Sequence, residues 1–186
     1  MTHHRRRNNG IDPSKINETV ELSPAQRYAA FKQTQAKQRT VAAEFARSMP
    51  FELDEFQMQA NDALEAGDNV LVAAPTGAGD FAIYLAQTRN VKAFYTTPIK
   101  ALSNQKSHDL VDQYGTDKVG LLTGDTSINS EADIVVMTTE VLRNMLYEHS
   151  VTLEALRYVI LDEVHYLADR FRGPVWEEVI IHLPKN

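Results

Sequence analysis

The chain has 186 residues, 43% of them hydrophobic, which is enough to bury one core of ordinary domain size and not two. The net charge of −6 hides a basic arm, because Lys and Arg outnumber Asp and Glu in residues 1–47 while acidic residues dominate 48–186. An acidic body argues against a protein that coats nucleic acid nonspecifically, although a local basic groove is compatible with it.

Cysteine is absent, so the sequence offers neither disulfides nor thiolate metal ligands and favours a cytoplasmic protein. No apolar run approaches the ~20 residues that cross a bilayer. The basic residues near the N-terminus are followed by polar residues and not by the apolar core of a signal peptide. We therefore expect no membrane partner.

The N-terminal part of the chain reads as an arm followed by a helix. Residues 1–22 are polar and rich in turn signals, which predicts a disordered basic arm. Ser23 and Gln26 have the spacing of a capping box, so a helix is predicted over 23–48. Its apolar side chains form only a thin stripe, which is typical of a helix on the surface of a domain.

From residue 49 onward, short apolar runs alternate with helical patterns. A helix that Gly67 should end comes first. Near-continuous apolar strands that alternate with helices predict an α/β fold, with a mostly parallel sheet covered on both faces. The expected strands lie at 69–74, 92–97, 118–122, 133–137 and 157–161, and the expected helices at about 80–88, 99–114, 139–147, 163–170 and after Pro174.

Two adjacent carboxylates, Asp162 and Glu163, follow the apolar run 158–161 and so stand at the end of a buried strand. One carboxylate in such a position can hold the Mg²⁺ of a nucleotide, usually through water, while the next orients the water that attacks the γ-phosphate. The competing interpretation is a helix N-cap followed by a first-turn acid, both of which the helix dipole favours.

A glycine-rich turn upstream could supply the phosphate site that such carboxylates need. The apolar run 70–73 leads into Ala74, Pro75, Thr76, Gly77, Ala78 and Gly79, whose backbone N–H groups could surround a phosphate. The Lys-[Ser/Thr] pair of a P-loop should follow Gly79, but Asp80 and Phe81 stand there. The short stretch from there to the next strand predicts a first helix that is cropped at its N-terminus.

Taken together, these residues resemble the first RecA-like lobe of a superfamily-two nucleic-acid helicase of DEAD/DEAH type, most closely the Ski-like RNA helicases and their bacterial HelY-type relatives. The similar segments occur in the family's order and predict a RecA-like P-loop lobe over 49–186. They are Phe51–Gln57, Ala74–Gly79, Thr97–Gln105, Thr123–Asp125, Thr138–Arg143, Asp162–His165 and Arg172–Glu178.

The resemblance implies ATP and Mg²⁺ as cofactors. Phe51 and Gln57 would read the adenine, and the glycine-rich turn would hold the phosphates. Asp162 would hold Mg²⁺, Glu163 would position the water, and His165 would couple the nucleotide site to later elements. The alternatives for the adenine segment are a core Phe and a helix-capping Gln, since short motifs misfire often.

The resemblance also implies single-stranded RNA or DNA as the partner, held by its backbone. Threonines that end strands just before helices place hydroxyls and free N–H groups at the carboxyl edge of the sheet, where such ligands bind. A solvated helix face for Lys100 and Arg143, and an N-cap role for Thr139, are the alternatives. The implied contact residues are Thr97, Pro98, Lys100, Gly124, Thr138, Thr139 and Arg143.

Two departures from the family bear on activity. Its motif III and second RecA-like lobe, with the arginine fingers, are not found in residues 50–186, so we expect no unwinding by this chain alone. Relatives also place Lys-Thr and several more residues between Gly79 and a segment like Asp80–Ile83, which indicates a gap of about five residues here and not point substitutions. Two functions remain open: an ATP-binding lobe of a helicase, and a degenerate, non-catalytic module that has lost this pair and binds nucleic acid or protein.

Overall fold

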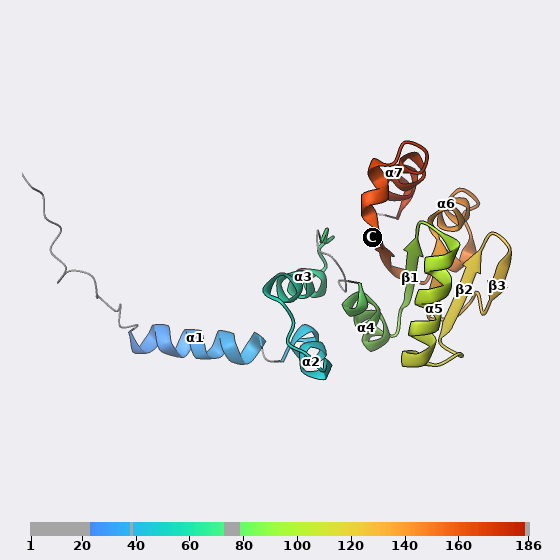
Figure 1. Cartoon of the computed structure of the whole chain (residues 1–186). Helices are drawn as coiled ribbons and strands as arrows, with labels where there is room; N and C mark the ends of the chain where they lie inside the picture. The colour runs from blue at the N-terminus through green and yellow to red at the C-terminus, as the bar shows by residue number, and fades with distance from the viewer. Residues whose placement is uncertain (1–22, 38, 73–78, 185–186) are drawn as a thin grey trace, which may run out of the picture. The chain divides into compact units, whose positions relative to one another are not determined.

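The computed structural model describes residues 23–37, 39–72 and 79–184, and the chain divides into two units, Met1–Thr40 and Val41–Asn186 (Figure 1). In the first unit, α1 (Pro24–Lys37) begins at the predicted capping box. Ser23 N donates to Gln26 Oε1 at 2.8 Å, and Gln26 N donates to Ser23 Oγ at 3.3 Å. The arm predicted over 1–22 lies outside the described residues.

The single helix predicted over 23–48 is wrong, because α2 (Val41–Ser48) has an N-terminus of its own. The N–H groups of Val41 and Ala42 donate to the Glu65 carboxylate at 3.0 and 2.7 Å, where a continuous helix would use carbonyls one turn earlier. Ala42 and Phe45 are buried, so α2 contributes to the core of the second unit and is not a surface helix.

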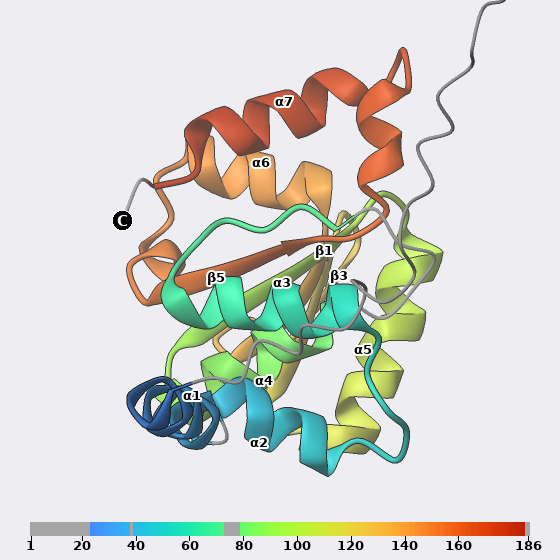
Figure 2. The ribbon, with the colours of Figure 1, turned by 90° about the vertical axis from the view of Figure 1, so that its left-hand side faces the viewer.

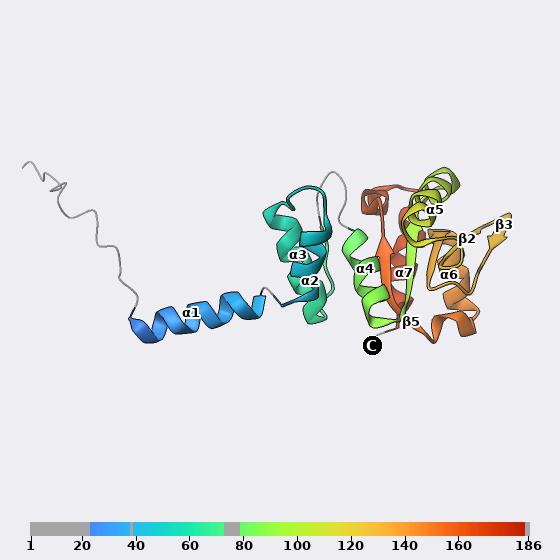
Figure 3. The same ribbon diagram turned by 90° about the horizontal axis from the view of Figure 1, so that it is seen from below.

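The helix α3 (Glu55–Ala66) lies beside α2 (Figure 3) and ends where the sequence predicts. Gly67 closes it in the left-handed conformation, with φ of 98°. Phe45 of α2 packs against Phe81 at a ring-centroid distance of 5.3 Å. This contact attaches the helix pair to α4 (Asp80–Arg89) and, through it, to the sheet.

The sheet has the order β3-β2-β4-β1-β5 and is mostly parallel. β1 pairs in parallel with β4 and β5, β2 pairs in parallel with β4, and β3 adds an antiparallel edge to β2. All the predicted strands after the first are confirmed to within one residue, whereas the short β3 was not predicted. Their bounds are β1 (Lys92–Thr97), β2 (Val119–Thr123), β3 (Thr126–Ile128), β4 (Ile134–Thr138) and β5 (Leu156–Leu161).

The first predicted strand, at 69–74, does not form over its described residues 69–72, and residues 73 and 74 lie outside the described part. Leu71 is 79% exposed, and no described strand pairs with this segment. Within the described residues, β5 therefore pairs only with β1, and its apolar residues Tyr158 to Leu161 are only partly buried.

Helices cover both faces of the sheet, which confirms the predicted layered α/β fold (Figure 2). α4 and α5 (Lys100–Tyr114) cover one face, and α6 (Thr139–Tyr147) with α7 (Gly173–His182) covers the other. The buried residues between sheet and helices form two clusters. One holds Ile83, Tyr95, Leu110, Val119, Leu121, Ile134 and Val136, and the other Phe94, Ala132, Val135, Met137, Leu142, Leu146, Leu156 and Val179.

The helix predicted at 163–170 is a shorter 3-10 helix, η3 (Val164–Ala168), and a second short one, η2 (Val151–Leu153), precedes β5. η3 stops because the Asp169 carboxylate accepts the N–H groups of Phe171 and Arg172, both at 2.8 Å, and so begins a new turn. None of the helices in the described residues is long and apolar enough to cross a membrane.

Candidate nucleotide and nucleic-acid site

The acidic pair lies at the carboxyl end of β5, as predicted. Asp162 N donates to Thr96 O at 3.0 Å, which extends the β1–β5 pairing as far as the acid. Its side chain is held at both oxygens: Tyr95 Oη donates to Oδ2 at 2.7 Å and Glu163 N donates to Oδ1 at 2.9 Å. The half-buried carboxylate therefore has a fixed orientation.

Tyr95 lies buried next to Asp162 and binds its carboxylate, a role that the sequence did not indicate. Its side chain is buried, and burial followed by the bond to Asp162 raises the pKa of the phenol well above its usual range. The Lys106 ammonium lies 4.9 Å from the ring centroid and 2.7 Å from Asp80 Oδ1. The Asp80 carboxylate, at the start of α4, is thus paired with a cation from α5.

Glu163 adopts a backbone conformation that is rare for a residue with a side chain, with φ of 58° and ψ of 41°. A left-handed conformation costs such a residue about 1–2 kcal/mol. Its Oε2 lies 3.1 Å from Nδ1 of His165. These predicted catalytic residues are therefore brought together, and the Glu163 carboxylate faces the imidazole and not the Asp162 carboxylate.

Gly79, the last residue of the glycine-rich turn, lies directly against the strands that carry the site. A Cβ added at Gly79 would come within 2.9 Å of Ile160 Cγ2 and 3.1 Å of Tyr95 Cε2. A larger residue at Gly79 would have to displace these two side chains, so glycine suits the close approach to β1 and β5. The other residues predicted to hold phosphate lie outside the described residues: Ala74, Pro75, Thr76, Gly77 and Ala78.

The residues present fit a nucleotide-bound Mg²⁺. Such an ion keeps several waters and takes one or two carboxylates together with the phosphates, so it needs no cage of protein ligands. Each oxygen of Asp162 accepts one hydrogen bond and retains a lone pair for water or metal. The described part of the chain holds no cluster of three or more side chains suited to bind a metal without a nucleotide.

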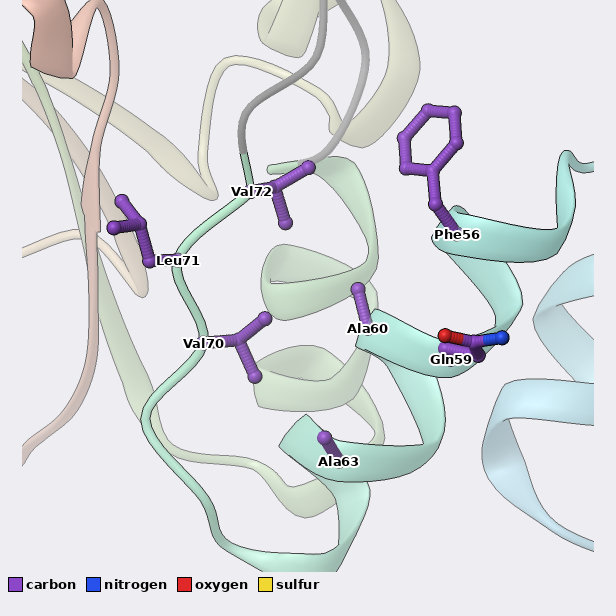
Figure 4. A pocket seen from close by; sticks show the side chains of 7 residues that line it. All are labelled: Phe56, Gln59, Ala60, Ala63, Val70, Leu71 and Val72. Atoms are coloured by element: carbon purple, nitrogen blue, oxygen red, sulfur yellow. The ribbon is translucent and has the colours of Figure 1, made fainter.

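The two residues predicted to read the adenine, Phe51 and Gln57, lie in different surroundings. Phe51 is 59% exposed, and Gln57 Oε1 accepts Asp54 N–H at 2.9 Å, so the helix-capping alternative for Gln57 is confirmed. Neither side chain lines the groove of about 320 Å³ beside α3 (Figure 4). That groove is mostly apolar and is formed by Phe56, Gln59, Ala60, Ala63, Val70, Leu71 and Val72.

Three of the threonines predicted to contact nucleic acid are buried and brace the strand ends. Thr97 Oγ1 donates to Ile99 O at 3.1 Å and lies 2.7 Å from Ser103 Oγ. Thr139 Oγ1 donates to Thr97 O at 3.2 Å, which ties the end of β4 to that of β1. The N-cap of α6 is Thr138 and not Thr139. These side chains shape the sheet edge and do not project from it.

The predicted basic contacts are nearer the surface, and each is paired with an acid. Lys100 Nζ lies 2.7 and 2.6 Å from the two carboxylate oxygens of Asp125. This bond is the main cause of a lowered pKa of Asp125. Gly124, next to it, is exposed. Arg143 Nε lies 3.8 Å from Glu178 Oε2 of α7, so it stands apart from the Lys100 pair.

Pro98 is buried, and its carbonyl oxygen accepts a hydrogen bond from Arg172 Nη1 at 2.9 Å. Arg172, like Tyr95 and Lys106, was not singled out from the sequence as a site residue. The only available signals were general ones: a Tyr in a buried strand needs a partner for its hydroxyl, and a charged side chain near the core needs an acceptor.

Comparison with known proteins agrees with this geometry. The family model described as DEAD/DEAH box helicase matches residues 54–186. The chain is 61% identical over 147 residues to "Probable helicase HelY" of Mycobacterium tuberculosis, covering 76% of this chain and 16% of that protein. It is 51% identical over 146 residues to "Antiviral helicase SKI2" of Saccharomyces cerevisiae, covering 76% of this chain and 11% of that protein.

A solved structure has the same fold. Helicase Lhr of Mycobacterium smegmatis, bound to ssDNA and AMP-PNP, superposes with a TM-score of 0.60 and 28% identity, over 77% of this chain and 22% of Lhr. The chain thus spans only a small part of the relatives that it matches. Because the family model covers well over half of its residues, this chain belongs to the DEAD/DEAH box family of ATP-dependent helicases.

Proposed function

We propose that this chain is the first RecA-like lobe of an ATP-dependent RNA helicase, which binds MgATP and the backbone of a single strand. The observation that carries the proposal is the convergence of Gly79, Asp162 and the β1–α5 turn at one edge of the sheet. Ligands of open α/β sheets bind at this edge. We propose RNA and not DNA as the bound strand because the motifs resemble those of Ski-like RNA helicases.

In this proposal each acidic residue has a separate task. Asp162, held at both oxygens, would hold the waters of a nucleotide-bound Mg²⁺. Glu163 orients the attacking water once its carboxylate leaves His165. When bound, MgATP supplies the phosphoryl group and the cation that neutralises charge developing on it. Tyr95 keeps Asp162 in place and excludes water from beneath it.

The nucleic-acid strand would lie along the outer ends of β1 and β4. Lys100 and the exposed backbone at Gly124 contact phosphates, whereas Thr97, Thr139 and Pro98 hold the local backbone in shape. Arg143 forms a second basic contact on α6. Because phosphate contacts dominate, binding should vary little with sequence and weaken strongly with salt.

A second function, a binding module without catalysis, is favoured by one observation. Asp80 occupies the start of α4 where a P-loop would place its lysine, and Lys106 neutralises it at 2.7 Å. A cation engaged in this pair is less available to a nucleotide. Such a lobe would keep the nucleic-acid surface and would not bind MgATP, even at millimolar concentrations. The cytoplasmic location expected from composition stays a prediction under either function.

Calorimetric titration with MgATP distinguishes the two functions. The helicase proposal expects weak binding, with a dissociation constant of about 1 mM, which Asp162→Asn weakens about fivefold. Asp109→Asn, an exposed acid on α5, is the matched control and should change nothing. Insertion of a Lys-Thr-containing segment after Gly79 should tighten binding to the micromolar range.

An oligonucleotide titration completes the test. A labelled uridine oligomer should bind, and its affinity should fall steeply as salt rises. Binding of the oligomer together with no MgATP binding, even after the insertion, would favour the non-catalytic module. If neither MgATP nor the oligomer binds to the chain, both functions are rejected.

A further inference from the structure

We propose that Arg172 is a positioning residue that couples the acidic nucleotide site to the turn that holds the nucleic-acid strand. The inference rests on the proposed function and deepens it. Arg172 precedes α7, far in sequence from the β1–α5 turn, yet its Nη1 donates to Pro98 O at 2.9 Å. The guanidinium therefore fixes a peptide between Thr97 and Lys100.

The same guanidinium is also attached to the acidic loop. Its Cζ lies 5.4 Å from the ring centroid of Tyr166, a distance typical of a cation–π contact. The backbone N–H of Tyr166 donates to Glu163 O at 3.0 Å, so one backbone hydrogen bond links Tyr166 to the residue proposed to orient water. A continuous path of contacts thus runs from Glu163 through Tyr166 and Arg172 to the Pro98 carbonyl.

The backbone around Arg172 is rigid enough to transmit a displacement. Asp169 Oδ1 accepts the Arg172 N–H at 2.8 Å, and Gly173 N donates to Asp169 O at 2.8 Å. A Cβ at Gly173 would lie 2.4 Å from Leu167 O, so η3 and the start of α7 are in direct backbone contact. A shift of η3 should therefore move Arg172 and not be absorbed by a loose loop.

In this proposal Glu163 has two positions, and the path of contacts changes with them. Its left-handed backbone and its contact with His165 define the state seen here. If Glu163 turns to orient water beside a bound nucleotide, the carbonyl that accepts Tyr166 N–H moves with it. Arg172 carries this change to the Pro98 peptide, and thereby to the position of Lys100. Each ligand should then alter the affinity of the other by the same factor.

The test measures this factor in the 186-residue chain. The dissociation constant of a labelled uridine oligomer is measured without nucleotide and with saturating Mg²⁺ and a non-hydrolysable ATP analogue. We expect a ratio of about five between the two constants. Arg172→Ala should bring the ratio close to one, and should change the affinity for either ligand alone by less than about twofold.

Three further variants separate coupling from a general structural defect. Arg170→Ala removes an exposed arginine from the same loop and should leave the ratio unchanged. Tyr166→Leu removes the ring and should lower the ratio in the same direction as Arg172→Ala. Arg172→Lys keeps a donor but loses the planar stacking group, so it should give an intermediate ratio. Thermal unfolding of each variant identifies any that fail to fold.

A double-mutant cycle on oligomer affinity decides the matter without nucleotide. If Arg172 links the two regions, Asp162→Asn changes oligomer affinity in the wild-type background but about threefold less in the Arg172→Ala background. An unchanged ratio in Arg172→Ala, or a wild-type ratio of one when both ligands bind, would overturn the inference while leaving the proposed function intact. Loss of binding by wild type to both ligands would instead reject the function itself, and the inference with it.

Discussion

Replacing Tyr95 with Phe removes one hydroxyl, and its effect on stability should reverse with pH. At neutral pH the substitution deletes the 2.7 Å hydrogen bond to the Asp162 carboxylate. A hydrogen bond to a charged group contributes about 1.5–3 kcal/mol. Because Asp162 is only half-buried and can regain some solvation, we expect a loss of unfolding free energy around or below the lower end of this range, about 1–2 kcal/mol.

At alkaline pH the same hydroxyl lowers the free energy of unfolding. Burial, and then the bond to Asp162, raises the pKa of Tyr95 above its ordinary value of 10.0. The folded state therefore retains the proton that the unfolded chain releases, so this stabilisation is complete below pH 10 and is lost as the pH rises further. The loss amounts to about 1.4 kcal/mol per pH unit, and the Phe variant should match wild type near pH ~11.

Urea unfolding of both proteins, from neutral pH to pH ~11, measures this difference. Other tyrosines titrate in both proteins, so their contributions cancel. Tyr147→Phe is the control, because Tyr147 is 52% exposed and its substitution should have no effect at either extreme. A neutral-pH difference below about 0.5 kcal/mol, or a difference that does not shrink between pH ~10 and ~11, would refute the assigned contact.

Three further expectations concern single contacts. Asp125→Asn should release Lys100 and tighten oligonucleotide binding about threefold at low salt, with no gain at high salt. Glu65→Ala should lower the unfolding free energy by about 1–2 kcal/mol in urea melts, because two N–H groups at the start of α2 lose their acceptor. Gly173→Ala should destabilise by more than about 2 kcal/mol in thermal unfolding, because its Cβ would overlap a backbone oxygen of η3.

Each of these variants has a matched control in the chain. Asp112→Asn on α5 removes an equal charge without touching Lys100 and should leave oligonucleotide affinity unchanged. Asp62→Ala, on the same helix as Glu65, should not affect stability. Gly124→Ala introduces a Cβ with no heavy atom within 4 Å and should be tolerated. Equal effects in a variant and its control would contradict the contact concerned.

The sequence predicted those features that depend on neighbouring residues. The capping box at Ser23, the helix end at Gly67 and the bounds of β1 all follow from local chemistry, and all are present. The apolar run before Asp162 and Glu163 predicted that they follow a strand, because a buried parallel strand is apolar along its length. The fold class and the family therefore followed from sequence alone.

The remaining features arise from contacts between distant residues. Helix α2 starts at Val41 because Glu65, from the next helix, binds its N–H groups, and no residue near Val41 signals this. The pairing of Asp80 with Lys106 depends on how α4 and α5 lie on the sheet. For the same reason, the position of Glu163 against His165, and the internal bonds of Thr97 and Thr139, could not be read from motif spacing.

The half-covered β5 strand affects how the isolated chain will behave in solution. Among the residues that the structure describes, β5 pairs along one edge only, and an unpaired edge of an apolar strand is a template for strands of other molecules and favours self-association. Arg157 and Asp162 are the charged residues at the two ends of the apolar run Tyr158–Leu161. We expect the chain to remain monomeric only when dilute and to form β-rich aggregates on concentration, so its binding constants belong to measurements at low protein concentration.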